Sequence, residues 1–555
     1  MTEPQPASSP KTNLAAIFSA VAVIGICLFS HLGALGLVGP DEPRYAWIAR
    51  AMAQTGDWVT PRLYGSPWFE KPILYYWAAA LGFALRLPAE WAARLPSAIA
   101  ALAAALAIAW LGKKHYGAAL ENQSGDHAFA ISPALLAPVI FSASLAAIGF
   151  ARAATPDMLF SASIALAMAA AASCLRRAGA LRNGNAASTH NQKLSAGTLA
   201  LFGAFLGLGV LAKGPAAVIL AGGAIGIWAL ATKQLRAALS LAHPIAIAAF
   251  CVVALPWYVI CARRNPDFLH IFIFQHNFER YLTPVFQHIQ PFWFFVPITL
   301  LAVLPWTPFL LSTVSESRRT MRANTWKNSP GFFFACWALF PILFFSFSQS
   351  KLPSYILPAI PPLALLIAVS ACRTSAPSRR LFIVISSAIA ITWLVLGVAA
   401  WEYFAADPQS GLASKLVLIV ALIAAVLSFV FGFRSNFKSL ILTSAWAVAI
   451  AVELAGFALL PAIDPSVSAR DRATMISGQP GTNFYTFHLQ RSWNYGLAFY
   501  AGRPLEEWSP ENSGAATLLT TSPGLIELKK LGRFTGSVNP QERGIRYVRL
   551  EPVTR

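Results

Sequence analysis

The sequence has 555 residues, of which 56% are hydrophobic and only 12% are charged. Apolar runs of roughly 18 to 22 residues recur along it, which is the length of a helix that crosses a bilayer, so a water-soluble globular protein is excluded and a polytopic membrane protein is predicted. The net charge of +19 would indicate a nucleic-acid partner in a soluble protein. Here most of the excess lies in the N-terminal tail and in alternate connections such as Lys113-Lys114 and Arg176-Arg177, as the positive-inside rule expects of cytoplasmic segments. We therefore expect no nucleic-acid partner.

The apolar runs predict a transmembrane domain over residues 14–460, after a cytoplasmic tail at residues 1–13. A first span begins at Leu14 and ends near Gly36. Further spans are predicted near 91–112, 131–150, 157–175, 195–212, 214–231, 241–261, 291–312, 331–348, 354–372, 381–401, 414–432 and 439–460. The total is about thirteen. With the N-terminus in the cytoplasm, as the positive-inside rule predicts, an odd number of spans places the C-terminus outside.

Hydropathy falls after residue 460, and residues 461–555 are predicted to form a small soluble α/β domain on the periplasmic side. Period-two alternation at Asn483–Phe487 and at Arg546–Leu550 is typical of strands, and turn residues occur at Ser522–Gly524 and Asn539-Pro540. The six cysteines of the chain show no paired spacing, so neither a disulfide framework nor a zinc motif is predicted.

Residues 37–90 form the longest polar interruption in the first third of the chain, and we expect them to be a periplasmic loop with two helices along the membrane interface. Glu42 is expected to cap the first helix, and Gly56 to end it. The second is expected to start near Pro72, with Tyr75 and Tyr76 at the level of the lipid headgroups.

This loop contains the acidic and basic residues that a catalytic or phosphate-binding site needs. Asp41 and Glu42 could be a solvated helix cap, or they could be catalytic carboxylates that accept a proton from an acceptor hydroxyl. Arg44 lies one helical turn beyond Asp41, and Lys71 follows Glu70 after a tight turn. Cations that converge in this way are typical of a phosphate site.

Other outer connections carry isolated ionisable residues. Asp157 is the only carboxylate between Asp126 and Asp267, and an ionised group near the bilayer needs a partner or a task. Lys213 and Lys351 stand in short outer connections, against the positive-inside trend. With Arg152, and with a loop that contains His276, Glu279 and Arg280, they predict an anion-binding outer face.

Five segments carry a resemblance to a known family. They are Gly39–Ala46, Phe69–Trp77, Arg152–Leu159, Leu211–Pro215 and Ser350–Pro358. Together they resemble the dolichyl-phosphate-mannose protein mannosyltransferase superfamily, and within it the bacterial lipid A aminoarabinose transferases.

The resemblance implies a GT-C fold and an inverting transfer of one sugar from a polyprenyl (undecaprenyl) phosphate donor. The acceptor would be a lipid such as lipid A, or a protein, on the periplasmic face of a bacterial inner membrane. Asp41 matches a catalytic carboxylate and Asp157 a second essential acid. Lipid-phosphate binding is expected of Lys71, Arg44, Arg280 and Tyr355, together with Lys213 and Lys351. Glu70 and His276 match positions considered for a metal; two such residues do not make a site, so a divalent metal is left open and no cofactor is required.

Other functions stay open at this level. A protein O-mannosyltransferase-like enzyme would share the same donor chemistry. A lipid-linked sugar transporter would place charges and broken helices near the membrane midplane. An oligosaccharide transferase or O-antigen ligase would need a larger acceptor groove, and a structural scaffold would leave the ionisable cluster unexplained. A monomer is expected.

Overall fold

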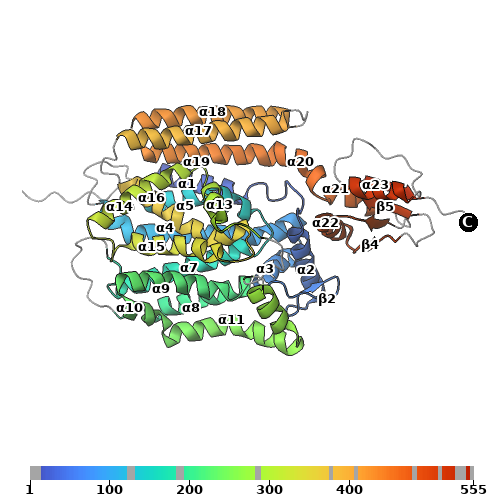
Figure 1. Cartoon of the computed structure of the whole chain (residues 1–555), viewed down its shortest axis with the longest axis horizontal. Helices are drawn as coiled ribbons and strands as arrows, with labels where there is room; N and C mark the ends of the chain where they lie inside the picture. The colour runs from blue at the N-terminus through green and yellow to red at the C-terminus, as the bar shows by residue number, and fades with distance from the viewer. Residues whose placement is uncertain are drawn as a thin grey trace, which may run out of the picture.

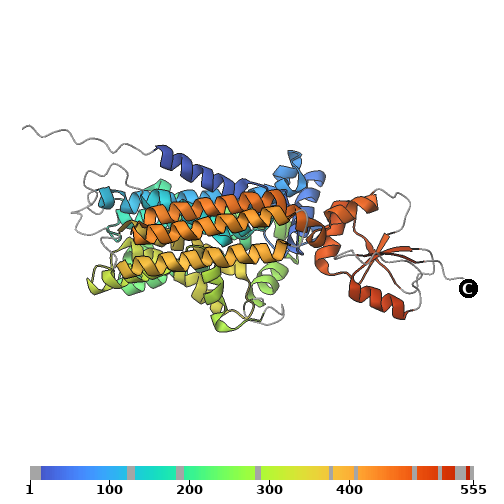
Figure 2. The same cartoon turned by 90° about the horizontal axis from the view of Figure 1, so that it is seen from above.

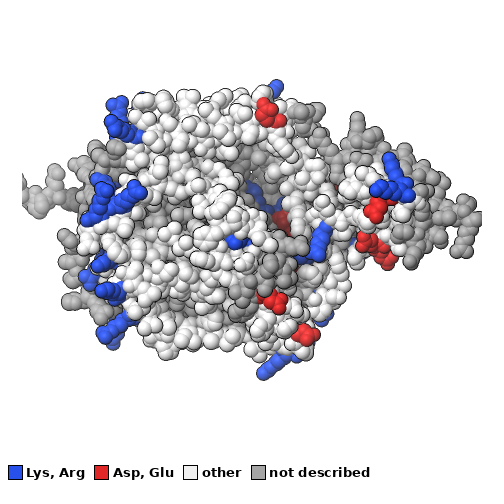
Figure 3. All heavy atoms as spheres, viewed as in Figure 1, with Lys and Arg blue, Asp and Glu red and all other residues white. Residues whose placement is uncertain are grey.

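The computed structural model describes residues 14–121, 132–182, 193–279, 281, 289–373, 379–405, 410–434, 436–477, 484–509, 516–531 and 546–550. Within these ranges the molecule is a bundle of long helices that run side by side along its long axis, with a strand-containing unit at one end (Figures 1 and 2). Figure 3 shows a broad middle with almost no charged side chains, while Lys and Arg gather at the end away from that unit. This distribution is that of a polytopic helical membrane protein.

The first half of the bundle contains ten helices and one small hairpin of interest here. They are α1 (Leu14–Phe29), α2 (Asp41–Thr55), the hairpin β1 (Arg62–Leu63) and β2 (Ser66–Pro67), α3 (Leu74–Ala84), α4 (Ala89–Glu121), α5 (Pro133–Ser142), α6 (Leu145–Ala151), α7 (Asp157–Arg177), α8 (Ala196–Lys213), α9 (Ala216–Thr232) and α11 (Pro244–Arg264).

The second half continues with a π-helix, further spans and short helices. They are η2 (His270–Glu279), α13 (Phe295–Ala302), α14 (Leu310–Arg322), α15 (Pro330–Ser346), η5 (Pro353–Ala359), α16 (Ile360–Arg373), α17 (Arg379–Phe404), α18 (Gly411–Phe433), α19 (Phe437–Leu454), α20 (Leu460–Val467) and α21 (Arg470–Ser477).

The described residues hold 8 helices long and apolar enough to cross a membrane, or 10 if each of two bent pairs is one span. The bent pairs are α5 with α6, at 63°, and Phe292–Ala302 with Thr307–Arg322, at 109°. Helices α1, α9 and α15 are apolar but only 16 or 17 residues long. A span needs about 17 to 25 residues, so these helices lie at the lower limit and the total of thirteen stays a prediction.

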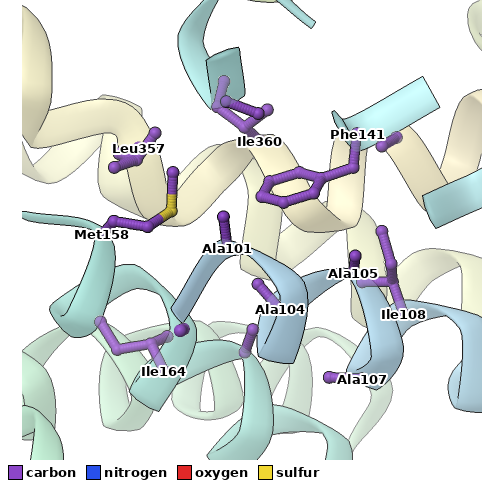
Figure 4. Packing of buried hydrophobic residues seen from close by; sticks show 14 of the residues in the cluster. Ala101, Ala104, Ala105, Ala107, Ile108, Phe141, Met158, Ile164, Leu357 and Ile360 are labelled. Carbon is purple, nitrogen blue, oxygen red and sulfur yellow. The ribbon is translucent and has the colours of Figure 1, made fainter. Parts of the chain in front are cut away.

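Small residues let the helices of this bundle approach closely. Figure 4 shows Ala101, Ala104 and Ala105 of α4 packed among larger side chains, including Phe141 of α5 and Met158 of α7. A Cβ added at Gly203 of α8 would lie 1.9 Å from the carbonyl oxygen of Ala246 in α11, so only glycine permits this contact. Small residues at contacts between spans are typical of membrane bundles.

The C-terminal unit contains a four-stranded sheet of order β4-β3-β5-β6. Its elements are β3 (Phe484–Phe487), α22 (Arg491–Ala501), β4 (Glu506–Glu507), β5 (Ala516–Thr520), α23 (Ser522–Lys530) and β6 (Arg546–Leu550). Strand β3 pairs in parallel with β4 and β5, and β5 pairs antiparallel with β6. Helix α22 contacts α2, where the Arg50 guanidinium donates to the Phe499 carbonyl at 2.9 Å.

The loop at residues 37–90 differs from expectation in two ways. Gly56 does end α2, in the left-handed conformation at φ 72°, but Pro40 rather than Glu42 is the N-cap residue, and no side chain caps the helix. Tyr75 and Tyr76 are each only 1% exposed and pack in the main core rather than at headgroup level. The prediction for these two tyrosines was wrong because neighbouring helices cover α3.

Candidate functional site

Three helix ends and one loop meet at the end of the bundle that faces the C-terminal unit. Asp41 is the first residue of α2, Asp157 is the first residue of α7, and Lys213 is the last residue of α8. Glu70 and Lys71 lie in the short segment between the hairpin and α3. A carboxylate at a helix N-terminus and a cation at a helix C-terminus are both favoured by the helix dipole.

A first cluster forms around the guanidinium of Arg44. Its Nη2 lies 2.5 Å from Asp41 Oδ1 and 2.9 Å from Glu70 Oε2. Lys71 Nζ donates to the other oxygen of Glu70, at 3.1 Å. The side chain of Asp41 is 51% exposed, whereas that of Arg44 is 10% exposed. Asp41 is therefore the accessible member of a chain of alternating charges.

Aromatic rings enclose the same guanidinium. The Arg44 carbon Cζ lies 5.1 Å from the ring centre of Tyr45, 5.3 Å from that of Trp68 and 5.6 Å from that of Tyr495. Such contacts hold a cation in place by attraction to the ring faces. Tyr495 comes from α22, so the C-terminal unit contributes directly to the site.

A second cluster joins α7, α8 and η5. The carboxylate of Asp157 accepts a hydrogen bond from Lys213 Nζ, and a hydrogen bond also joins it to the side chain of Ser354. The Lys213 ammonium lies 5.0 Å from the ring centre of Tyr355. The predicted residues Asp157, Lys213 and Tyr355 are thus brought together.

The two clusters are close enough to influence each other. The pKa of Asp41 is raised, chiefly because the surrounding protein removes part of the water around this half-exposed carboxylate, with the Arg44 cation opposing the rise and the charges of Glu70 and Asp157 adding to it. A carboxylate with a raised pKa is a stronger base than an ordinary one, because it holds a proton more tightly. Asp41 is consequently suited to accept a proton.

Glu42 has a structural position. Its Oε1 accepts from Arg94 Nε at 3.1 Å and from the Ala154 amide at 2.7 Å. Its Oε2 accepts from Arg94 Nη2 at 2.7 Å and from the Val38 amide at 2.9 Å. Four donors occupy this buried carboxylate, so it ties α2 to α4 and to the α6–α7 connection, and a direct catalytic role does not fit these contacts.

Two of the predicted anion-binding cations also bond to backbone instead. Lys351 is 7% exposed and donates to the carbonyls of Ser348 at 2.6 Å and Gln290 at 3.0 Å. Arg152 donates to the carbonyls of Ile26 and Ser30 at the end of α1, at 3.1 and 3.2 Å. These contacts engage both cations with backbone carbonyls, so neither residue joins the clusters. The third, Arg280, lies outside the described residues.

A divalent metal does not fit the residues expected to hold it. Both carboxylate oxygens of Glu70 already face cations, Arg44 and Lys71, and a metal ion beside them would add a third positive charge. His276 belongs to η2. In the described part of the chain, no group of three or more His, Cys, Asp or Glu side chains lies close enough to hold a metal.

An apolar groove opens between α3 and α4. Its volume is about 440 Å³, and residues of α3 and α4 line it together with Leu159, two positions after Asp157. The lining side chains include Leu81, Leu85 and Ile99, all of which are exposed. The groove therefore offers an exposed apolar surface to a lipid chain.

Two residues of the candidate site were not predicted from the sequence. Arg94, inside an apolar run, is the partner of Glu42, and a lone charge in such a run is a usable signal. Tyr495 lies some 450 positions from Arg44 and had no local signal, because only the docking of α22 on α2 brings the two side chains together.

Comparison with known proteins agrees with this architecture. Residues 14–272 match the family model described as dolichyl-phosphate-mannose-protein mannosyltransferase. A relative from Edwardsiella ictaluri, named undecaprenyl phosphate-alpha-4-amino-4-deoxy-L-arabinose arabinosyl transferase, is 31% identical over 59% of this chain and 54% of its own length. One of the same name from Yersinia enterocolitica is 33% identical over 60% of this chain and 55% of its own length. The chain thus spans about half the length of the curated relatives that it matches.

Among solved structures, the crystal structure of ArnT from Cupriavidus metallidurans bound to undecaprenyl phosphate superimposes with a TM-score of 0.75. The match covers 97% of this chain and 98% of that one, at 22% identity. The apo form of the same protein gives a TM-score of 0.74. The chain therefore has the GT-C fold of ArnT over nearly its whole length, and the resemblance of its first half to the dolichyl-phosphate-mannose-protein mannosyltransferase family is confirmed.

Proposed function

We propose that this protein is a membrane glycosyltransferase that moves a single sugar from a polyprenyl (undecaprenyl) phosphate donor to a membrane acceptor, with inversion at the anomeric carbon. The observation that carries the proposal is the accessible Asp41 carboxylate, with its raised pKa, beside the cations Arg44 and Lys71. The names of the relatives support aminoarabinose as the sugar. Lipid A is the acceptor best in keeping with that donor, and a protein acceptor is the alternative.

In this reaction the bond between the anomeric carbon and the phosphate oxygen breaks, and a bond from an acceptor oxygen to that carbon forms. Negative charge then develops on the departing polyprenyl phosphate. Lys71 uses one of its three N–H donors on Glu70, so the others can meet a phosphate oxygen. Cations placed in advance stabilise the leaving group as its charge appears.

The proton balance depends on the acceptor. If a hydroxyl attacks, its proton passes to Asp41, whose raised pKa favours that transfer. If a phosphate oxygen attacks, the nucleophile is already anionic, and Asp41 orients the donor or the acceptor. Asp157 holds Lys213 near Tyr355 and keeps this second cation beside the same site.

The apolar groove supports a lipid donor. Its walls are hydrophobic, so a polyprenyl chain could lie in it, and Leu159 in its lining belongs to α7, the helix that Asp157 begins. Within the same proposal, the site and the unit at residues 461–555 face the periplasm of a bacterial inner membrane, the N-terminus is cytoplasmic, and the protein acts as a monomer.

The contacts favour an enzyme over a transporter. Bent helix pairs of the kind that transporters use do occur. However, the ionised residues sit at helix termini: Asp41 and Asp157 begin helices, and Lys213 ends one. A transporter would instead need its coupling charges near the midplane of the membrane.

A transfer assay tests the proposal. Membranes that contain the wild type or a variant would receive radiolabelled polyprenyl-phosphate sugars, and the label in the lipid A and protein fractions would be counted. We expect Asp41→Asn and Lys71→Ala each to lose transfer by about 10² to 10⁴-fold, with expression intact. The matched control is Lys113→Ala, an exposed lysine of α4 outside both clusters. Full transfer by both site variants would refute the proposed site.

A further inference from the structure

A second pocket lies between the end of α2, the β1–β2 hairpin and the C-terminal unit. Its volume is about 290 Å³. Trp47 and Met52 of α2 and Tyr64 of the hairpin turn form its apolar part, and Arg503, from the turn after α22, lines it from the other side. Because the lining comes from α2, the hairpin and the C-terminal unit, the pocket exists only where this unit docks on the other two.

The aromatic part suits a sugar ring. The rings of Trp47 and Tyr64 are 4.8 Å apart and nearly perpendicular, at 72°. The Arg50 guanidinium covers one face of Trp47, at 5.0 Å from the ring centre, so the C–H face of a pyranose would pack against the aromatic surface that this cation leaves open, with its hydroxyls turned outward. The volume lies near the lower end of the range for small-ligand pockets, about 300 to 1,000 Å³, which fits a single ring rather than a chain.

The polar part suits an anion. Asp57 also lines the pocket, but its carboxylate is engaged by Arg62 and Arg264, each at 3.5 Å, and by the amides of Val59 and Thr60. Arg503 is exposed, and in the described part of the chain it takes part in none of the ion pairs. A guanidinium that is free in this way presents a bidentate fork that matches a phosphate group.

Two tyrosine side chains link the pocket to the charged site. Tyr64 lies 6.4 Å from Tyr495 between ring centres, and Tyr495 in turn covers the Arg44 guanidinium. Along α2, Trp47 follows Arg44 by one helical turn. The pocket and the charged site are therefore neighbours that are linked through Tyr64 and Tyr495.

We propose that this pocket is a subsite for a phosphorylated sugar headgroup of the acceptor, gripped by Trp47 and Tyr64 and held by the Arg503 guanidinium. The inference rests on the proposed function, because it assigns the second substrate of the same reaction. It gives the C-terminal unit a role in acceptor selection. It also explains why the aromatic wall and the free cation come from different parts of the chain.

The first test measures binding without turnover. The full chain is purified into lipid nanodiscs and titrated either with glucosamine 1-phosphate or with the uncharged sugar N-acetylglucosamine. Binding is followed by saturation-transfer difference NMR. A Lys71→Ala background removes a competing cation of the catalytic cluster. We expect Trp47→Ala and Arg503→Gln each to weaken binding of the phosphorylated sugar about tenfold or more. Arg491→Gln, an exposed arginine of α22 outside the pocket, should bind as the background does.

Equal binding by Trp47→Ala, Arg503→Gln and the background protein would overturn the subsite. Equal affinity for the charged and the uncharged sugar would overturn the role of Arg503. The second test uses transfer kinetics, in which Arg503→Gln should raise KM for the acceptor about tenfold while kcat and KM for the donor stay unchanged. A wild type that binds the sugar phosphate but transfers nothing would count against the proposed function and not against the pocket. If Arg503→Gln transfers the sugar with an unchanged KM for the acceptor, the result would count against the pocket and not against the proposed function.

Discussion

Replacement of Glu42 by glutamine separates a structural carboxylate from a catalytic one, because Glu42 and Asp41 are neighbours in sequence with different surroundings. The Glu42 side chain is 8% exposed and that of its partner Arg94 is 4% exposed. Arg94 also donates to the carbonyls of Leu32 at 2.8 Å and Gly36 at 2.7 Å, but these neutral acceptors carry no compensating charge. Glutamine at position 42 would leave the Arg94 cation buried without a counter-charge.

Removal of one partner from a buried ion pair costs about 3–5 kcal/mol. We therefore expect Glu42→Gln to lower the thermal midpoint of the detergent-purified protein by several degrees, as followed by tryptophan fluorescence. Transfer per folded molecule should stay close to that of the wild type. Asp41→Asn should behave in the opposite way, with an unchanged midpoint and strongly reduced transfer. Glu507→Gln, at an exposed position of β4, is the matched control for loss of a carboxylate.

A double variant sharpens the test. Glu42→Gln combined with Arg94→Met removes both charges, and a neutral replacement of a buried pair is commonly tolerated. The double variant should therefore be more stable than Glu42→Gln alone. A Glu42→Gln protein with the wild-type midpoint but no transfer would refute the reasoning and would return Glu42 to the catalytic residues.

Three further predictions concern the clusters. Activity should fall as pH falls through the raised pKa of Asp41, and Arg44→Gln should move this acid limb of kcat/KM to higher pH, because the guanidinium lowers that pKa. Tyr495→Ala should lower kcat/KM between about twofold and 30-fold, in line with loss of a cation–π contact of roughly 0.5–2 kcal/mol, while Tyr495→Phe should retain most activity. Lys213→Met and Asp157→Asn should each reduce transfer, and the double variant should be less impaired than the product of the two single effects, because the two residues act as a pair.

Each of these has a result that would contradict it. An acid limb that does not move in the Arg44 variant would show that another group controls the profile. A Tyr495→Phe protein as impaired as Tyr495→Ala would assign the effect to the hydroxyl rather than to the ring. Strictly multiplicative effects at Asp157 and Lys213 would show that the observed contact carries no functional coupling.

Sequence patterns alone determined where most helices lie. The predicted span at 157–175 is α7 (Asp157–Arg177), and the one at 195–212 is α8 (Ala196–Lys213). This works because a bilayer fixes both the length and the composition of a spanning helix. The contact between Asp41 and Arg44 was also predictable, since residues three apart on a helix are neighbours.

Only the tertiary structure decided which charge meets which. Glu42 and Arg94 are 52 positions apart, Asp157 and Lys213 are 56 apart, and His31 and Glu453 are 422 apart. The sequence indicates that an ionised group in an apolar setting needs a partner, because burial without one is costly. It does not indicate the partner, because that depends on which helix ends the packing of small residues brings together. For the same reason two residues that are adjacent in sequence differ in role: Glu42 is a buried partner of Arg94, and Asp41 is an accessible base.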